Sequence, residues 1–599
     1  MRRLFPFLAL LLAAACSQPE CPSLLPLPKQ VEWLKGTVSA QTPVAARLVE
    51  AIPEASLNEG EAYRLVVGRD SIRLEATTPQ GLWHARQTLL QLEQGGKIPR
   101  CRITDWPSFR VRGWMMDVGR TYVSLEELYR EVDIFSRFKL NVLHLHLTEN
   151  EAWRLESRLY PQLNAPESMT RQPGLFYTQE QMKALDAYCR ERGVTLIPEL
   201  DMPGHSRAFE AAMGFPMQSP EGKEALKALL DELMGVFSAP LIHIGTDEVH
   251  FTDKDFVPEM VAHIRSRGRK ALSWNPGWPY GPGEIDGLQL WSYRGKALKG
   301  TPAVDCRLHY LNHYDIFGDI IGLHTSRILD VEEGSAEGAG SIVAVWNDQC
   351  FEEGPMLRDN NLYACALALA DRAWRGGGYQ YFADFGTILP PEGPAREDYL
   401  DFENRMLSFR ESVLKDVPFP YVKQGHASWA ISPVYPNGGQ LDAVFPPEEG
   451  AWETAHIVTG SGIYFRHVWG AIKTVASLYP DPRPCSTVYA STQVYSDHPQ
   501  EVGLFFETQN HSRSEKDLPA PEGAWDYRHS RLWINGAEIL PPASAVKLEK
   551  GWNTVLIKLP VGGFTTPEAR LVKWMFTCAF TTPDGRAAAP LRYRAFGRE

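Results

Sequence analysis

The strongest constraint on the fold is an alternation of short apolar segments and longer amphipathic segments between residues 109 and 410. The short segments have the length of buried strands, and the segments between them repeat with the period of a helix. Such an alternation indicates βα units around a parallel sheet. The expected strands are Gly113–Val118, Val142–Leu147, Thr195–Leu200, Leu241–Gly245, Ala271–Trp274, Leu288–Trp291, Val304–Leu308 and Ser341–Val345. Eight successive units predict a (β/α)8 TIM barrel, with boundaries at 107–412.

The segment before the predicted barrel, residues 22–106, has a different pattern. Tyr63–Val67 and Ser71–Glu75 alternate apolar and polar side chains, as half-buried strands do. Gly81–Leu92 has apolar residues at helical spacing. These features predict a small α+β domain in front of the barrel.

Residues 420–599, after the predicted barrel, are rich in glycine, proline and aromatic residues. Thr487–Tyr495 and Val555–Leu559 are strand-like, and Asn535-Gly536 between apolar runs is a hairpin signal. This composition and strand pattern predict an all-β sandwich. The fold class expected for the chain is therefore multi-domain α/β, with the barrel between the α+β domain and the sandwich.

The N-terminus has the pattern of an export signal. Arg2 and Arg3 precede an apolar run from Leu4 to Ala15, which is too short to cross a hydrocarbon core of about 30 Å. The run ends at Cys16 and resembles a bacterial lipoprotein signal, in which residues 1–15 are removed and Cys16 is lipidated. We therefore expect an exported, membrane-anchored lipoprotein of a bacterial cell envelope, facing the periplasm or the cell surface. The alternative is ordinary signal cleavage, with Cys16 lost or free.

Composition and charge exclude several classes of function. The chain has 61 Lys and Arg residues against 73 Asp and Glu, a formal net charge of −12. A nucleic-acid binder needs a basic face, and no basic run follows Arg3, so we expect no nucleic-acid partner. No later apolar run is long enough to span a membrane. The histidines and acids lack the spacing of metal ligands, so we expect no metal and no other cofactor.

A polar or aromatic side chain follows each predicted strand. The C-terminal ends of the strands of such a barrel share one rim, where active sites form. The residues at these positions are Arg120, Glu149, Asp201, His205, Asp247, Glu248, Trp274, Trp291, Tyr310 and Trp346. They predict a pocket for a ligand that is polar and also has flat apolar faces. Within the second strand, His144 and His146 are expected to face inward into a polar network.

The most informative segment is LIHIGTDEVH (241–250), in which an apolar strand runs directly into Asp247 and Glu248. Two carboxylates at the mouth of a barrel suggest general acid–base catalysis of glycosidic bond cleavage. Retaining enzymes with their own nucleophile place two carboxyls about 5–5.5 Å apart on opposite sides of that bond. Adjacent residues, with Cα atoms about 3.8 Å apart, are poorly placed for this. They suit a mechanism in which one acid protonates the leaving oxygen and the other steers a 2-acetamido group of the substrate onto the anomeric carbon.

Several linked stretches, in this order, resemble glycoside hydrolase family 20, the β-N-acetylhexosaminidases. They are RGWMMDVGR (112–120), NVLHLHLTENEAWRLE (141–156), YPQL (160–163), LIPELDMPGHSRAF (196–209) and IHIGTDEVH (242–250). The resemblance extends from residue 24 to about 410. It implies an exo-acting retaining hydrolase that releases terminal β-linked N-acetylglucosamine or N-acetylgalactosamine from glycans.

The resemblance also implies a role for each matching position. Glu248 is the general acid and then the general base, Asp247 holds the acetamido nitrogen, and Tyr310 donates its hydroxyl to the acetamido oxygen. The positions implied to bind or surround the sugar are Arg120, Glu149, His205, Trp274, Trp291, Asn312, Trp346 and Asp348. Trp274 and Trp291 enclose the acetamido methyl, and Trp346 stacks under the sugar ring.

Three of these positions depart from the family pattern. Glu149 lies in HLHLTENEAWR, where the family usually has Asp in HWHLTDDQGWR. Asn312 replaces an Asp after the tyrosine, and Asp348 replaces a Glu after the tryptophan. The last two positions usually contact the ring hydroxyls at C4 and C6. The departures leave open which amino sugar is preferred.

Two other functions remain as alternatives. The substituted HLTENEAW motif is compatible with a glycan-binding lipoprotein that has lost catalysis. Shortened side chains would also widen the pocket enough for a barrel glycosidase that releases disaccharides. The sequence does not indicate an oligomeric state.

The C-terminal segments SRLWINGAEILPP (530–542) and LEKGWNTVLIKLP (548–560) resemble strands of galactose-binding-like sandwiches. One interpretation is a carbohydrate-binding module with Trp525, Trp533 or Trp552 as an aromatic platform. The other is a packing domain with these tryptophans in its core.

Overall fold

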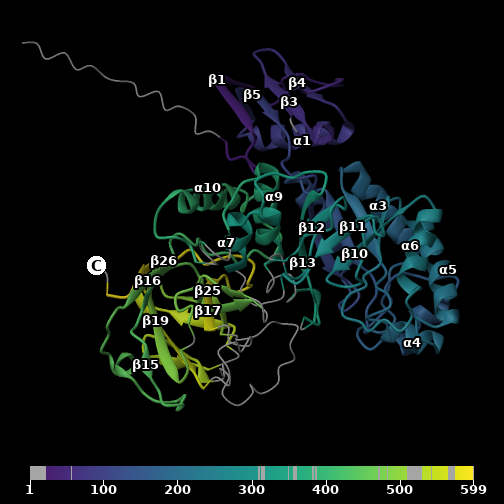
Figure 1. Ribbon diagram of the computed structural model, residues 1–599. Helices are drawn as coiled ribbons and strands as arrows, with labels where there is room; N and C mark the ends of the chain where they lie inside the picture. Colours follow the sequence, from purple (N-terminus) through teal and green to yellow (C-terminus); the bar gives the residue numbers. More distant parts are fainter. Residues whose placement is uncertain are drawn as a thin grey trace, which may run out of the picture.

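The computed structural model describes residues 22–597 except 56, 308–309, 312–317, 349, 355–360, 381–383, 385–387, 470–472, 482, 509–528, 541–542 and 564–573. The predicted signal (1–15) and the predicted residues Cys16, Asn312 and Trp525 lie outside the described residues. Figure 1 shows an N-terminal unit above a barrel and a β-sandwich beside the barrel. No helix among the described residues has both the length and the apolar character needed to cross a bilayer.

The N-terminal unit is a five-stranded sheet in the order β1-β5-β3-β4-β2, with α1 (Pro79–Leu92) packed against it. Its strands are β1 (Gln30–Ser39), β2 (Val44–Leu48), β3 (Tyr63–Val67), β4 (Ile72–Ala76) and β5 (Lys97–Asp105). Alternate residues of β3 are fully buried, as the sequence pattern predicts. The helix begins at Thr78, whose side chain accepts a hydrogen bond from the Gly81 N–H at 3.2 Å.

Polar contacts tie this unit to the barrel. The Trp374 indole N–H, from a helix of the barrel, donates to Asp105 Oδ1 at 2.8 Å. Arg112, on the first barrel strand, is fully buried and donates to Glu61 Oε1 at 3.1 Å. Buried ion pairs of this kind fix relative orientation, because breaking one leaves a charge without compensation.

The barrel is closed by eight parallel strands that neighbour one another in chain order, which confirms the predicted fold class. They are β6 (Val111–Asp117), β7 (Val142–His146), β8 (Thr195–Glu199), β9 (Leu241–His243), β10 (Lys270–Asn275), β11 (Gly287–Leu290), β12 (Ala303–Asp305) and β13 (Gly338–Val345). Each overlaps a predicted strand. β9 ends two residues before the predicted end at Gly245, because the chain turns into left-handed backbone at Gly245 and Thr246.

Helices surround the barrel in the described part of the chain. They are α2 (Leu125–Arg137), α3 (Gln179–Glu191), α4 (Arg207–Met213), α5 (Pro220–Val236), α6 (Phe256–Ser266), α7 (Gly318–Thr325), α9 (Leu362–Arg375) and α10 (Pro394–Ser408). α2 shows why they pack this way: Leu128, Val132 and Phe135 recur at helical spacing and are buried. α9 is buried along almost its whole length, and its Trp374 belongs to the core of the N-terminal unit.

The C-terminal unit contains two antiparallel sheets whose facing side chains form one core. One sheet has the order β16-β14-β19-β24-β21-β22, with β15 and β26 also paired to β19; the other has the order β18-β17-β25-β20-β23. The strands are β14 (Ser428–Ile431), β15 (Tyr435–Pro436), β16 (His456–Thr459), β17 (Gly462–Trp469), β18 (Lys473–Val475), β19 (Ser486–Ser496), β20 (Gln500–Glu507), β21 (Arg531–Ile534), β22 (Ala537–Ile539), β23 (Ala545–Leu548), β24 (Gly551–Val561), β25 (Trp574–Thr581) and β26 (Arg592–Ala595). Asn535 and Gly536 join β21 to β22 with positive φ at both residues, which confirms the predicted hairpin.

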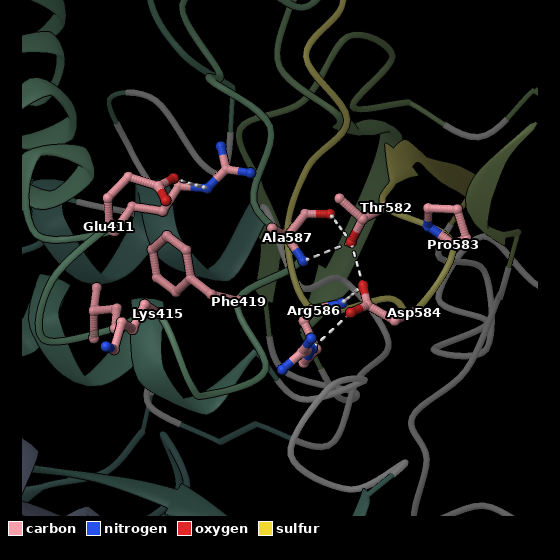
Figure 2. A pocket seen from close by; sticks show the side chains of 10 residues that line it. Glu411, Lys415, Phe419, Thr582, Pro583, Asp584, Arg586 and Ala587 are labelled. Atoms are coloured by element: carbon pink, nitrogen blue, oxygen red, sulfur yellow. Dashed lines mark hydrogen bonds and ion pairs between the residues drawn. The ribbon is translucent and has the colours of Figure 1, made fainter. Parts of the chain in front are cut away.

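The sandwich meets the barrel at the segment that follows α10. The Phe419 N–H donates to the Arg586 carbonyl at 2.7 Å, and Arg410 donates to the Ala588 carbonyl at 2.7 Å. A cavity of about 490 Å³ lies at this junction, where Asp584 accepts from the Arg586 side chain (Figure 2). None of the residues that line it is a predicted site residue.

Candidate active site

The described site residues all lie at the C-terminal ends of barrel strands or just after them, as predicted for the rim. Four aromatic side chains from this region form or border one apolar cluster inside the barrel: Trp274, Trp291, Tyr310 and Trp346. Trp346 is at its centre, with ring centroids 5.8 Å from Tyr310 and 5.7 Å from Trp274. Trp346 is 8% exposed, so a small part of its surface is open to a ligand.

The other two tryptophans are fixed by hydrogen bonds. Trp274 has no exposed surface, and its indole N–H donates to Glu199 Oε1 at 2.7 Å. Trp291 is half-buried and donates to the Pro276 carbonyl at 2.7 Å. The structure therefore places Trp274 at the buried base of the cluster and Trp291 at its edge.

Asp247 and Glu248 lie on a turn with unusual backbone conformations. Gly245, Thr246 and Glu248 have φ values of 65°, 82° and 49°. This left-handed region is rare for a non-glycine residue and strained for a β-branched one such as Thr246. Thr246 Oγ1 is 2.6 Å from Ser273 Oγ, which anchors the turn to β10. At Gly245, a Cβ atom would lie 1.6 Å from Asp201 Oδ1, so only glycine fits.

The turn sends the two carboxylates into different environments. Asp247 is 8% exposed as a residue, whereas the Glu248 side chain is 58% exposed. Burial raises the pKa of Asp247 to about 6; His205 opposes this shift, and the charges of Glu199 and Glu248 add to it. Burial also raises the pKa of Tyr310 well above its usual value, with contributions from the charges of both Asp247 and Glu248. The Tyr310 hydroxyl is therefore within electrostatic reach of both carboxylates.

Arg120 is the centre of an ion-pair network beside Trp346. Its guanidinium donates to Asp117 Oδ2 at 2.8 Å, contacts Glu149 Oε1 at 2.5 Å and lies 3.7 Å from Asp348 Oδ1. The guanidinium carbon is 5.3 Å from the centroid of the Trp346 ring. Three acids thus fix the planar fork of Arg120, an arrangement suited to holding sugar hydroxyls.

His205 connects Glu149 to the exposed Glu248. His205 Nδ1 is 2.5 Å from Glu149 Oε1, and His205 Nε2 is 3.8 Å from Glu248 Oε2. Burial lowers the pKa of His205, but the bond to Glu149 and the charge of Asp201 outweigh it and raise this pKa to about 10. His205 is thus a cation at neutral pH and attracts the Glu248 carboxylate. Glu149, which replaces the usual Asp, still contacts His205.

Beneath the rim, one carboxylate holds three histidines. Glu199 Oε2 is 2.9 Å from His144 Nε2 and 2.7 Å from His146 Nδ1, and Oε1 is 3.0 Å from His243 Nδ1. The sheet register explains the arrangement, because Glu199 is paired with His146 of β7 and with His243 of β9. His144 and His146 thus face inward into a polar network, as expected.

The protonation states within this network follow from its charges. Burial would raise the pKa of the Glu199 carboxyl, but the histidines hold it well below its usual range. Burial lowers the pKa of His144 to about 4. Burial also lowers the pKa of His146, but Glu199 and Glu149 outweigh it and hold this pKa well above its usual value. An ionised Glu199 therefore balances a protonated His146 under the aromatic cluster.

Among the described residues, three groups of side chains have potential cation ligands within 4.8 Å of one another: His144, Glu199 and His243; His146, Glu199 and Asp201; and Glu149, Asp201 and His205. The histidines in these groups already contact carboxylates at hydrogen-bond distance. We therefore interpret them as a proton-sharing network. Burial and the Asp247 charge raise the pKa of Asp201 well above its usual value.

Sequence reasoning missed three structural partners of the site: Asp117, Glu199 and His243. Each is the last residue of a barrel strand, and each is buried. Asp117 also accepts from the Asn347 N–H at 3.1 Å, which joins the first and last strands. The signal that could have identified them is their position, because a charged side chain in a buried strand needs a partner.

Two family models match the N-terminal part of the chain. Residues 109–219 match the catalytic domain of glycosyl hydrolase family 20, and residues 47–106 match domain 2 of the same family. These two segments are therefore similar to family 20. The matched catalytic segment includes Arg120, Glu149 and His205 of the site.

Relatives and a solved structure show the same similarity. A beta-hexosaminidase of Vibrio furnissii is 36% identical over 32% of this chain and 38% of its own length. A beta-N-acetylhexosaminidase of Cellulomonas fimi is 29% identical over 47% of this chain and 63% of its own length. Both matches thus span less than two thirds of the relative. The crystal structure of a beta-N-acetylhexosaminidase from Bacteroides fragilis has a TM-score of 0.53 at 24% identity, covering 64% of this chain and 95% of that chain, which shows a shared fold.

Proposed function

We propose that the chain is an exo-acting, retaining β-N-acetylhexosaminidase that releases terminal β-linked N-acetylglucosamine or N-acetylgalactosamine by substrate-assisted catalysis. One observation carries this proposal. A single strained turn presents a buried Asp247 and an exposed Glu248 at the barrel rim, which also carries Tyr310. This geometry suits a nucleophile that belongs to the substrate.

In the first step, Glu248 donates its proton to the glycosidic oxygen, and the bond from that oxygen to the anomeric carbon breaks. The acetamido carbonyl oxygen of the same sugar forms the new bond to the anomeric carbon and gives an oxazolinium ion. Asp247 accepts the acetamido N–H and offsets the positive charge, while Tyr310 donates its hydroxyl to the acetamido oxygen. Burial strengthens these interactions because little water competes for them.

In the second step, the ionised Glu248 takes a proton from water, and the water oxygen bonds to the anomeric carbon from the face that the leaving group vacated. The bond to the acetamido oxygen breaks, so the product keeps the β configuration. His205 Nε2 lies 3.8 Å from Glu248 Oε2 and can orient this side chain toward the water. Arg120 would hold ring hydroxyls through its fork while Trp346 contacts the apolar ring face.

Hydrolysis of paired aryl glycosides tests the proposal. We expect release of nitrophenol from 4-nitrophenyl N-acetyl-β-glucosaminide or its galactosaminide, and little from the β-glucoside, which lacks the internal nucleophile. Equal rates on glucosaminide and glucoside would contradict substrate assistance. Tight binding of chitobiose without any product would favour the alternative of a glycan-binding protein, and release of disaccharides would favour the wider-pocket alternative.

We also propose that residues 1–15 are removed and that lipidated Cys16 anchors the protein to a membrane of a bacterial cell envelope. The support is the order of Arg2-Arg3, a short apolar run and small residues before the cysteine. Mass spectrometry of the N-terminal peptide from the membrane fraction should show acyl chains on Cys16. Cys16→Ser should release the protein from that fraction, and unchanged retention of the variant would refute the anchor.

A further inference from the structure

A hollow of about 330 Å³ lies on the β-sandwich, remote in sequence from the barrel rim. Its lining includes Trp533 of β21, Thr554 and Leu556 of β24, and Phe596 after β26. The loop that begins at the 3-10 helix η6 (Pro446–Glu449) completes it with Glu448 and Trp452. A volume of this size lies at the lower end of the range for small-ligand sites and fits about one sugar ring.

The strand pattern shows that the aromatic lining is not part of the sandwich core. Leu532 and Ile534 point into the core, so Trp533 between them points to the opposite face of the sheet. Trp533 is half-buried and is paired in register with Leu556. The structure thus places Trp533 outside the sandwich core.

Two more aromatic side chains form another wall of the hollow. Trp452 and Phe596 pack edge to face, with ring centroids 5.6 Å apart, and both are half-buried. The Trp452 indole N–H donates to Thr454 Oγ1 at 2.8 Å, which fixes the ring. Partly exposed, rigid aromatic rings provide flat surfaces for the apolar faces of sugar rings at low cost in conformational entropy.

The polar lining determines the charge of a suitable ligand. Glu448 Oε1 accepts from Lys558 Nζ at 2.9 Å and from the Tyr489 hydroxyl. Both bonds end on Oε1, which leaves Oε2 as the acceptor for a ligand hydroxyl. Glu448 is the only charged residue among the described residues that line the hollow. Because Lys558 compensates the Glu448 charge and no cation lies in this described lining, nothing there attracts an anionic ligand, and a neutral ligand rich in hydroxyl donors is favoured.

We propose that this hollow is a second carbohydrate site, which binds one ring of a neutral glycan between Trp533 and the Trp452–Phe596 pair with its hydroxyls donating to Glu448. The site would hold the protein on the glycan chains from which the barrel removes terminal sugars. The choice of an N-acetylglucosamine polymer as the probe rests on the proposed function of the barrel.

Affinity electrophoresis of the full chain in native gels that contain glycol chitin, a soluble neutral polymer, tests the site. The parent protein carries Glu248→Gln and Trp346→Ala, which disable the proposed barrel site and prevent degradation of the polymer. We expect the parent to be retarded, and Trp533→Ala or Trp452→Ala to raise the dissociation constant by about tenfold. Trp552→Ala is the matched control, because Trp552 is 39% exposed on β24 but does not line the hollow; its retardation should equal that of the parent.

Four outcomes would overturn the proposal: no retardation of the parent, equal losses in Trp533→Ala and Trp552→Ala, no loss in the folded Trp533→Ala and Trp452→Ala variants, or retardation by the polyanion dextran sulfate instead of glycol chitin. Circular dichroism checks that each variant is folded. Hydrolysis of the aryl glucosaminide by the unmodified chain reports separately on the barrel, so failure of the proposed function and failure of this site are distinguishable.

Discussion

The barrel rim and the sandwich hollow both present tryptophans next to carboxylates, but they hold those carboxylates differently. At the rim, Glu149 and Glu199 each contact several cationic or histidine side chains, and Asp247 and Glu248 lie on a strained turn beside them. In the hollow, Glu448 lies in the 3-10 helix η6 and, among the described residues, pairs with one cation, Lys558 of β24.

This difference matches what binding and catalysis each require of a carboxylate. A platform with one acceptor is sufficient to hold a neutral sugar, and no group there needs an unusual protonation state. Catalysis needs acids whose charge states are set in advance, and the rim achieves this through buried networks that raise the pKa of Asp247 and keep His205 protonated. The largest effects of substitution are therefore expected at the rim.

Glu248→Gln should cause the largest loss of activity. It removes the proton donor, and we expect kcat/KM on the aryl glucosaminide to fall by about 10³-fold. The melting temperature should change little, because the Glu248 side chain is 58% exposed. Glu210→Gln, at an exposed acid on the nearby α4, is the control and should retain full activity. Near-normal turnover by Glu248→Gln would show that Glu248 is not the general acid.

Glu199→Gln should cause the largest loss of stability. It removes the negative charge that compensates the protonated His146 and also weakens the acceptor for Trp274, so the free energy of unfolding should fall by about 3–5 kcal/mol. Chemical denaturation measures this, with Glu191→Gln, a 74% exposed acid on α3, as the control. A change equal to that of the control would show that the buried network does not depend on this charge.

The acid side of the pH profile should depend on Asp247. Its raised pKa, about 6, means that the carboxylate takes up a proton as the pH falls through 6 and can no longer accept the acetamido N–H. We expect kcat/KM to fall about tenfold per pH unit below that value. Asp247→Asn should have low activity without this decline, whereas Asp255→Asn, an exposed control, should keep the wild-type profile. If both variants showed the same decline, a group other than Asp247 would be responsible for the fall in kcat/KM.

Glu448→Gln should have the smallest effect of these substitutions. The amide oxygen can still accept from Lys558, which also donates to the Ala443 carbonyl at 2.8 Å. We expect the free energy of unfolding to fall by about 1 kcal/mol, measured by chemical denaturation under the conditions used for Glu199→Gln. A loss as large as that of Glu199→Gln would mean that the two regions depend on their carboxylates equally.

The sequence predicted the parts of the molecule that depend on local patterns. Strand lengths, the order of βα units and the Asn535-Gly536 hairpin follow from periodicity and turn chemistry over a few residues, and all three agree with the structure. The residues after each strand could be assigned to one rim because closure of a parallel barrel brings strand ends together.

The sequence could not predict contacts that depend on register and on turn conformation. Glu199 meets His146 and His243 only because β7, β8 and β9 align these positions across strands far apart in the chain. The left-handed conformation of Glu248, which separates it from Asp247, also has no sequence signal. The outward direction of Trp533 required the sheet to show which face of β21 is buried.

The nucleophilic role of the substrate can be measured most directly with aryl glucosaminides whose 2-acetamido group carries zero, one, two or three fluorine atoms. Fluorine withdraws electrons from the carbonyl oxygen and changes the size of the group little. If that oxygen attacks the anomeric carbon, log(kcat/KM) should fall steeply and steadily with each fluorine. Equal rates across the series would show that the acetamido oxygen forms no bond in the transition state and would contradict the proposed chemistry of Asp247 and Glu248.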